Sequence, residues 1–243
     1  MGNSHLQDIE EAYRNSPPDD YDALGDIKFV RLFDKKYEPV IQYSNGEILY
    51  NKNLEDDVLE LAKDGQFGAI VTSILGAEHF IWSIQGQERP FDVILPFASE
   101  LPRVPNAELV PFTALYSMVK ETIGSYLQFN KRLADLASLP VFQLLPPLPV
   151  CSQDTILTSS PEPLKTMLLE NGVPDPIIRY KMWRLWIYVA EEIAAEQGVG
   201  IIPTPEEAGD ENGFLKLEYA RDSVHANATL GMLTWREINT FFS

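Results

Sequence analysis

The chain contains three histidines, and each ends a short polar motif: Gly2-Asn3-Ser4-His5, Gly76-Ala77-Glu78-His79 and Asp222-Ser223-Val224-His225. A histidine activates a serine hydroxyl by accepting its proton, and a carboxylate on the other ring nitrogen fixes the tautomer of the imidazole. Ser4 as nucleophile, His225 as general base and Asp222 as orienting acid would therefore suit nucleophilic catalysis.

Each motif also has a purely structural interpretation. Ser4 precedes a predicted helix, where backbone N–H groups favour a developing negative charge, but serine is also common there as an N-cap. Asp222 precedes His225 by three residues and can reach its Nδ1, or the pair can simply lie on the surface at a helix start. The Gly76–His79 turn follows a predicted buried strand and either directs donors at an oxyanion or only joins strand to helix.

Hydrophobic periodicity predicts the elements that position these motifs. Helices are predicted from just after Ser4 to the 16–20 segment and over 54–62, 111–136, 163–171, 174–197 and 226–242, and strands over 26–33, 67–74, 141–145 and 199–202. Asn45-Gly46 predicts a hairpin over 40–50. Asn53 is the expected N-cap of the second helix, and Gly65 is its expected end.

Strands and helices alternate along the chain, which predicts an α/β fold, namely a three-layer α/β/α sandwich with a mainly parallel sheet. Ligands of such sheets bind at the carboxyl ends of the strands, where the Gly76–His79 turn lies. No break in composition divides the chain, so residues 1–243 are predicted to form a single domain, with 97–140 as a candidate helical insertion.

The chain has 19 basic and 36 acidic residues, a formal charge of −17, which argues against nucleic acid and anionic membranes as partners. Residues 1–26 hold seven acidic residues and one basic residue, so the surroundings of Ser4 suit a neutral rather than an anionic substrate. The longest basic cluster, Arg179-Tyr180-Lys181 with Arg184, is either part of a helix with one apolar face or a surface for an anionic substrate group.

Cys151 is the sole cysteine, which excludes a disulfide within the chain and a multi-cysteine zinc site. The histidines show no HxH or HExxH spacing, so neither a metal nor a cofactor is expected. No segment approaches the roughly 18 apolar residues that span a bilayer, and the first residues lack a basic-then-apolar signal pattern. The expected compartment is the cytoplasm, and the expected partner is a small molecule or another protein.

Together the three motifs resemble those of the SGNH/GDSL hydrolase superfamily, which comprises serine esterases and lipases with a flavodoxin-like α/β/α fold. The likeness runs in order along nearly the whole chain, from GNSH at residues 2–5, the spelling of a bacterial subgroup, to DSVHANATLG at 222–231. By this resemblance Ser4 is the nucleophile, His225 the general base and Asp222 the orienting acid.

The oxyanion hole departs from the family pattern. The family's third block, GxND, supplies an asparagine, whereas the corresponding residues Gly76–His79 carry Glu78 at that position, with His79 as another donor. An ionised carboxylate accepts hydrogen bonds but donates none. The family's second block contributes a glycine, and we assign this glycine to Gly46, with Gly25 as the alternative.

The start of the chain departs as well. In the family a central strand precedes the nucleophile, but only Met1, Gly2 and Asn3 precede Ser4 here. Because an unfilled central position would leave backbone groups unpaired, we expect either a displaced chain start or a sheet that is completed in another way.

The leading hypothesis is a serine hydrolase of carboxylic esters, such as O-acyl groups on a carbohydrate, with a small-molecule or saccharide ester as substrate. An acyltransferase would use the same residues and the same acyl-enzyme. The competing class is a non-catalytic SGNH-like module for binding or assembly. The distance between Ser4 Oγ and His225 Nε2 discriminates between the classes, and an exposed sheet edge would favour a homo-oligomer.

Overall fold

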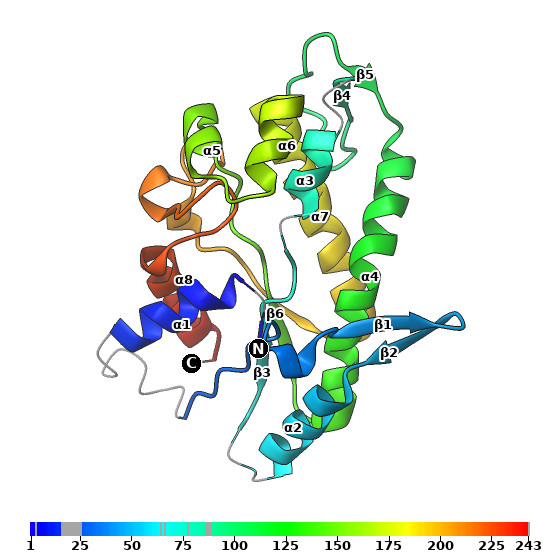
Figure 1. The fold of residues 1–243 in the computed structure, drawn as a ribbon, viewed down its shortest axis with the longest axis vertical. Helices are drawn as coiled ribbons and strands as arrows, with labels where there is room; N and C mark the ends of the chain where they lie inside the picture. The colour runs from blue at the N-terminus through cyan, green and yellow to red at the C-terminus, as the bar shows by residue number, and fades with distance from the viewer. Residues whose placement is uncertain are drawn as a thin grey trace.

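The computed structural model describes residues 1–2, 4–15, 26–63, 65, 67–76, 78–85 and 89–242 (Figure 1). Its helices are α1 (Leu6–Asn15), α2 (Lys52–Lys63), α3 (Glu78–Gln85), α4 (Phe112–Ala137), α5 (Gln153–Ser159), α6 (Leu164–Asn171), α7 (Pro176–Gln197) and α8 (Ala228–Phe242). Its strands are β1 (Ile41–Ser44), β2 (Glu47–Tyr50), β3 (Ile70–Thr72), β4 (Phe91–Asp92), β5 (Glu108–Leu109), β6 (Val141–Leu144) and β7 (Gly200–Ile202).

A parallel sheet in the order β3-β6-β7 forms the centre of the molecule. β6 is flanked on both sides, with Ile70 opposite Val141 and Phe142 opposite Gly200. Gly2 extends the sheet beyond β3, because it forms parallel bridges to both Ser73 and Arg31. The spatial order is therefore residues 30–32, residues 1–2, β3, β6 and β7.

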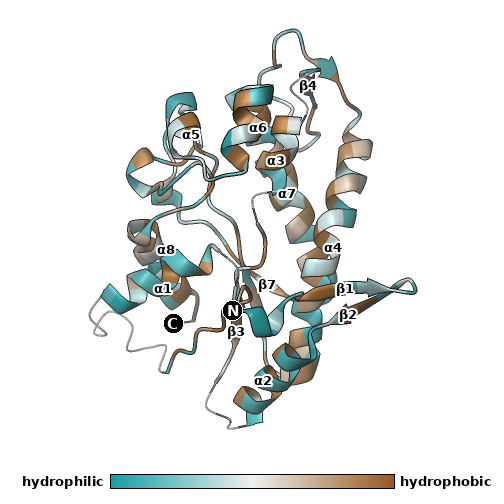
Figure 2. Ribbon diagram, viewed as in Figure 1, coloured by the Kyte–Doolittle hydropathy of each residue, from teal (hydrophilic) through white to brown (hydrophobic). Residues whose placement is uncertain are grey.

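Helices cover both faces of this sheet. On one face, apolar residues of α1 and α8 pack with Leu144 and Ile202 of the strands. On the other face, residues of α2, α4 and α7 pack with Ile74 and Val141. Figure 2 shows apolar residues along β3 and on α4 and α7 in this region. The predicted three-layer α/β/α sandwich with a mainly parallel sheet is confirmed.

Among the described residues, Met1 and Gly2 occupy the central position of the sheet. The Gly2 N–H donates to Val30 O (3.1 Å), the Leu32 N–H donates to Gly2 O (2.8 Å), and the Ser73 N–H donates to Met1 O (2.8 Å). The strand predicted over 26–33 is wrong apart from the single bridge at Arg31, because among the described residues the pairing of this segment is confined to Gly2.

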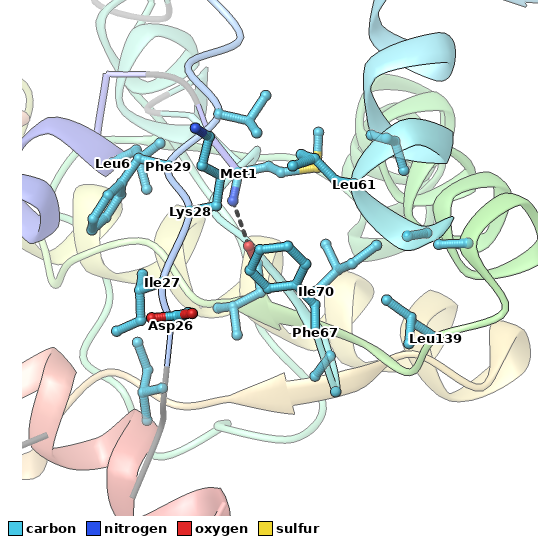
Figure 3. A pocket seen from close by; sticks show the side chains of 18 of the residues that line it. Met1, Leu6, Asp26, Ile27, Lys28, Phe29, Leu61, Phe67, Ile70 and Leu139 are labelled. Atoms are coloured by element: carbon cyan, nitrogen blue, oxygen red, sulfur yellow. Dashed lines mark hydrogen bonds between the residues drawn. The ribbon is translucent and has the colours of Figure 1, made fainter. Parts of the chain in front are cut away.

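A largely apolar cavity of about 380 Å³ continues this central position beyond Met1, between residues 26–30 and 67–71 (Figure 3). The Met1 ammonium donates to Val71 O over 2.6 Å. Its burial lowers its pKa to about 5. The cavity lies at the amino ends of the strands, and Ser4 is not among the residues that line it.

A helical region extends above the carboxyl ends of the strands, where α4 and α7 lie side by side (Figure 1). Its core is a separate apolar cluster that includes Leu95, Ile123 and Trp186. The C-terminal half of α4 also packs against the sheet through Phe129 and Leu133. The helix predicted over 111–136 thus contributes to both regions.

The basic side chains Arg179 and Lys181 on α7 are buried and bind other groups of the protein. Arg179 is fully buried and donates to the carbonyls of Val150, Cys151 (2.9 Å) and Pro174 (3.1 Å). Lys181 is 1% exposed and pairs with Asp92 over 2.7 Å. The interpretation of this cluster as a surface for an anionic substrate group is therefore wrong, and the interpretation as a packed helix holds.

Local sequence signals differ in how well they located the helix ends and turns. The Asn45-Gly46 hairpin is confirmed, with positive φ angles of 52° and 81° at these two residues. Asn53 is not the N-cap of α2, because the side chain of Asn51 accepts the Leu54 N–H instead. None of the predicted helices covers α5, although Ser152 caps it by accepting the Thr155 N–H.

The described residues offer neither a membrane-spanning helix nor a metal site. No helix among them is long and apolar enough to cross a membrane. Within the same residues, no group of three or more histidine, cysteine, aspartate and glutamate side chains gathers in a way that could hold a metal ion.

Candidate active site

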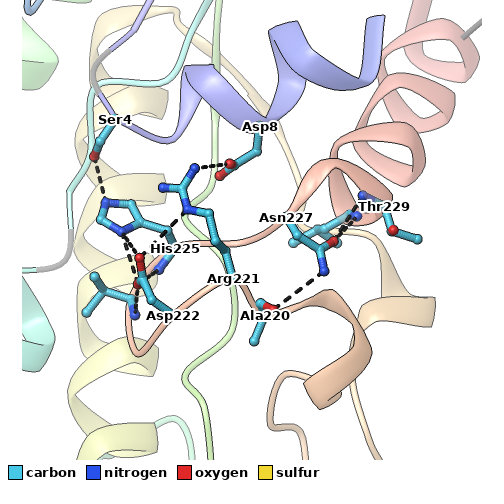
Figure 4. A network of polar contacts seen from close by, with 10 residues as sticks. Ser4, Asp8, Ala220, Arg221, Asp222, His225, Asn227 and Thr229 are labelled. Atoms are coloured by element: carbon cyan, nitrogen blue, oxygen red, sulfur yellow. Dashed lines mark hydrogen bonds and ion pairs between the residues drawn. The ribbon is translucent and has the colours of Figure 1, made fainter. Parts of the chain in front are cut away.

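Ser4, His225 and Asp222 form a continuous hydrogen-bonded series at the surface (Figure 4). Ser4 Oγ lies 3.0 Å from His225 Nε2. His225 Nδ1 lies 2.8 and 3.0 Å from the two carboxylate oxygens of Asp222. The order of the groups, hydroxyl then imidazole then carboxylate, is the order that general-base activation of a serine requires.

Ser4 is placed by the start of the central segment. Gly2 is held between two neighbours in the sheet, and a Cβ added to it would lie 2.7 Å from Ser73 O, so only glycine fits there. Two residues later the chain turns into α1, and the Ser4 carbonyl accepts the Gln7 N–H. Ser4 is consequently exposed at the carboxyl end of the sheet, beside the N-terminus of a helix whose dipole favours negative charge.

His225 is positioned by the loop of residues 221–225, which hydrogen bonds within the loop hold closed. Arg221 and Asp222 both donate their N–H groups to the His225 carbonyl, over 2.9 and 3.3 Å. Asp222 Oδ1 accepts the N–H groups of Val224 (2.9 Å) and His225 (2.8 Å), so the acid also orders the loop that carries the base.

The loop continues directly into α8. The Asn227 side chain accepts the N–H groups of Thr229 and Leu230, which makes it the N-cap of the helix, and it donates to Glu218 O. Its backbone N–H donates to Tyr219 O. Asn227 therefore fixes the start of α8, and with it the position of His225 two residues earlier in the chain.

The electrostatics of the series favour an ionised acid. Burial of Asp222 by itself raises its pKa, but hydrogen bonds from the His225 ring and from the Val224 and His225 N–H groups outweigh burial and lower it to about 2. A carboxylate that stays ionised across the physiological range can stabilise an imidazolium at His225.

His5 lies against the base, with the two imidazole centroids 5.3 Å apart. Burial lowers the pKa of His5 to about 3, so it is neutral at physiological pH. Burial likewise lowers the pKa of His79 to about 4. His5 and His79 line a common cavity of about 20 Å³, which has room for one water-sized group and not for a substrate.

The residues expected to form the oxyanion hole are not brought together in the way the sequence suggested. Gly76, Glu78 and His79 follow β3, whose last bridge is at Ser73 beside Gly2, so they share the sheet end with Ser4. The Glu78 carboxylate folds back over Gly76, where an added Cβ would lie 2.7 Å from Oε2.

Glu78 and His79 both lie in largely buried surroundings. Burial raises the pKa of Glu78, while hydrogen bonds from its own N–H and from Gly76 partly oppose that rise. His79 is 5% exposed and packs against Trp186, with ring centroids 5.9 Å apart. Among the described residues, neither side chain makes a hydrogen bond to Ser4 or His225.

The assignment of Gly46 to the oxyanion hole is wrong. Gly46 lies at the tip of the β1–β2 hairpin, which projects away from the body of the molecule in Figure 1. A Cβ added there would meet nothing within 4 Å. The alternative, Gly25, lies outside the described residues. The Ser4 N–H has no acceptor among the described residues, so it remains available as a donor.

Two site residues carried no signal in the sequence. Arg221 lies between the carboxylates of Asp222 and Asp8, and Asp8 belongs to the first turn of α1 (Figure 4). The Asp-x-x-His spacing identifies a base and its acid, but it contains nothing that singles out the residue before the aspartate. Asp8 looked like one more acidic residue of a polar helix.

Comparison with known proteins yields distant likenesses. No family model and no curated protein matches the chain. A GDSL-like lipase from Bacteroides thetaiotaomicron VPI-5482 is 13% identical with a TM-score of 0.49, and the match covers 100% of this chain and 85% of the lipase. A carbohydrate acetylesterase from Sinorhizobium meliloti is 12% identical with a TM-score of 0.39, over 79% of this chain and 67% of the esterase. The functional assignment therefore depends on the geometry around Ser4.

Proposed function

We propose that the protein is a serine hydrolase of carboxylic esters in which Ser4, His225 and Asp222 act as nucleophile, general base and orienting acid. The observation that carries the proposal is the 3.0 Å contact between Ser4 Oγ and His225 Nε2, made by residues from opposite ends of the chain. An N-cap serine needs no histidine, and a binding module needs no carboxylate behind that histidine. The order of motifs, which resembles that of SGNH/GDSL hydrolases, supports the same function.

In the proposed reaction, Ser4 Oγ attacks the acyl carbonyl of the ester while His225 Nε2 accepts the hydroxyl proton. Asp222 accepts the Nδ1–H and stabilises the imidazolium. His225 then returns the proton to the departing alcohol, which leaves an acyl group on Ser4. A water molecule, deprotonated by His225, attacks this acyl-enzyme, and the acid departs as the proton returns to Ser4.

The oxyanion of each tetrahedral intermediate would form beside the N-terminus of α1. The Ser4 N–H supplies a donor in this scheme, and the helix dipole adds a favourable field. Glu78 and His79 take no part in it, because their side chains are held within their own surroundings. The scheme requires no metal and no cofactor.

The proposed substrate is a neutral ester of a small molecule or a saccharide. Ser4 is exposed, and the apolar cavity of about 380 Å³ at the other end of the sheet does not include it, so the site suits a short acyl group on a solvent-exposed alcohol. The excess of acidic residues in the sequence, with a formal charge of −17, disfavours an anionic substrate. Acetylated saccharides are accordingly the natural candidates to test, with p-nitrophenyl acetate as the general probe.

The proposal is tested with a fluorophosphonate probe, which reacts with activated serines, and with hydrolysis of p-nitrophenyl acetate. The wild type should be labelled, and Ser4→Ala should lose labelling and lose roughly 10³-fold or more in kcat. His225→Ala should behave like Ser4→Ala because the base is then missing.

Ser152→Ala provides the matched control. Ser152 is an N-cap serine that accepts the Thr155 N–H, so its removal tests the structural role without touching the site. This variant should be labelled like the wild type. A wild type that is not labelled at any pH from about 6 to 9, the range in which a histidine base titrates, would instead support the non-catalytic module.

A further inference from the structure

Arg221 occupies a position between two carboxylates that belong to different parts of the chain (Figure 4). Its Nη1 lies 2.6 Å from Asp8 Oδ1, and its Nε lies 3.7 Å from Asp222 Oδ2. The Asp8 side chain is only 3% exposed, so its charge depends on a partner, whereas Arg221 is 34% exposed. A buried carboxylate without its cation would be strongly unfavourable, so the Asp8–Arg221 pair is held together.

This ion pair connects the element that carries the nucleophile to the loop that carries the base. Asp8 lies four residues after Ser4 on α1, and Arg221 immediately precedes Asp222. The Ser4–His225 hydrogen bond is exposed, and it alone would be a weak link between two surface segments. The ion pair adds a second link beside it.

The backbone around Asp8 is itself fixed by close packing between α1 and α8. A Cβ added to Gly231 would lie 2.4 Å from the Asp8 carbonyl oxygen, so the two helices touch at this point. The Trp235 indole N–H donates to Ile9 O over 2.8 Å in the same interface. The backbone of Asp8 is thus held in place by the α1–α8 packing, and its carboxylate offers the Arg221 side chain a partner in a fixed position.

We propose that Arg221 is a positioning residue that, through Asp8, holds the Asp222–His225 loop at the distance from Ser4 that proton transfer requires. The inference rests on the proposed hydrolase function and adds two residues to it. Neither residue touches the reacting atoms. Their effect is on geometry, to which transition states are sensitive, since a misplacement of about 1 Å costs on the order of 10²-fold in rate.

The link is expected to depend on pH in a defined way. Burial raises the pKa of Asp8 to about 6, while the charges of Arg221 and His225 oppose the rise and those of Asp222 and Glu11 add to it. Asp8 Oδ2 has no hydrogen-bond partner among the described residues, so protonation at that atom breaks no other contact. Above pH 6 Asp8 is ionised and the pair is at full strength; well below pH 6 it is a neutral acid beside an arginine.

The test compares kcat and KM for p-nitrophenyl acetate in the wild type, Arg221→Ala, Arg221→Lys and Asp8→Asn. We expect Arg221→Ala to lose roughly 10- to 100-fold in kcat with KM within about twofold, because substrate contacts are unchanged. Arg221→Lys should recover part of the loss, since lysine restores the charge but not the two-nitrogen geometry. Arg132→Ala is the control, because it removes a 2.8 Å pair with Glu55 between α4 and α2, away from the site; it should leave kcat unchanged.

Asp8→Asn separates positioning from a general loss of structure. Its kcat should fall at pH 8 but converge on that of the wild type as pH falls below about 6, where Asp8 of the wild type is itself protonated. Equal kcat values for wild type and Arg221→Ala at pH 8, or a ratio of wild type to Asp8→Asn that does not vary with pH, would overturn the inference alone. A wild type without Ser4-dependent activity overturns the proposed function, and this inference with it.

Discussion

Replacing Asp8 by asparagine should change the pH dependence of stability in the direction that burial of a carboxylate produces. The ordinary aspartate pKa is 3.8, and burial raises that of Asp8 to about 6 in the folded protein. The folded state therefore binds the proton more tightly than the unfolded state. The stability associated with protonated Asp8 is fully present below pH 3.8 and is lost as pH rises through about 6.

The magnitude follows from the two pKa values. At about 1.36 kcal/mol for each tenfold change in proton affinity, the difference between 3.8 and about 6 amounts to at most about 3 kcal/mol. Asp8→Asn has no such titration. The free energy of unfolding of the variant minus that of the wild type should therefore rise by up to about 3 kcal/mol between pH 4 and pH 7. Because only the change with pH is used, any constant cost of the amide cancels.

Urea unfolding at a series of pH values measures this difference, with tryptophan fluorescence as the signal, since Trp235 lies in the α1–α8 interface. Glu10→Gln is the matched control on the same helix. Hydrogen bonds from Arg31 and Arg14 lower the pKa of Glu10, so its contribution is present above pH 4.5 and is lost as pH falls through the lowered value. Its difference curve should slope the opposite way, at lower pH. A difference for Asp8→Asn that stays constant within about 0.5 kcal/mol from pH 4 to 7 would refute the reasoning.

Two further predictions concern the site and its surroundings. Asp222→Asn removes the acceptor that selects the His225 tautomer, so kcat for p-nitrophenyl acetate should fall by roughly 10³- to 10⁴-fold with little change in KM; a loss below about tenfold would mean that Asp222 only orders its loop. Gly46→Ala places a side chain at a φ of 81°, which should cost about 1 kcal/mol in urea unfolding. The kcat/KM of this variant should equal that of the wild type. A large loss would indicate that Gly46 contributes to the oxyanion hole after all.

Predictions from the sequence succeeded where the physical cause is local. The Asn45-Gly46 hairpin needs two residues that tolerate positive φ, and this requirement is visible in the residue types themselves. The alternation of buried strands and amphipathic helices likewise predicts a layered parallel sheet, because each periodicity reports which faces must be covered. The contact between Asp222 and His225 spans three residues, which a loop can close by itself.

Predictions failed where a competing partner decided the outcome. Residues 26–33 have the composition of a strand, but a strand forms only as far as its neighbour pairs with it, and among the described residues this segment forms a single bridge, between Arg31 and Gly2. Asn53 is a good N-cap by type, yet Asn51 takes that position while the Asn53 amide donates to Lys36 O. Glu78 matches a motif position, but its carboxylate folds back over Gly76 of the same turn.

The sequence by itself determined which residue types are available for chemistry and the order in which they occur. It could not determine that Ser4 meets His225, because the two lie 221 positions apart and are joined only when the sheet places α1 beside the start of α8. It also could not reveal the role of Arg221, whose two carboxylates come from both ends of the chain. A charged side chain acquires such a role only when tertiary packing buries a carboxylate within its reach.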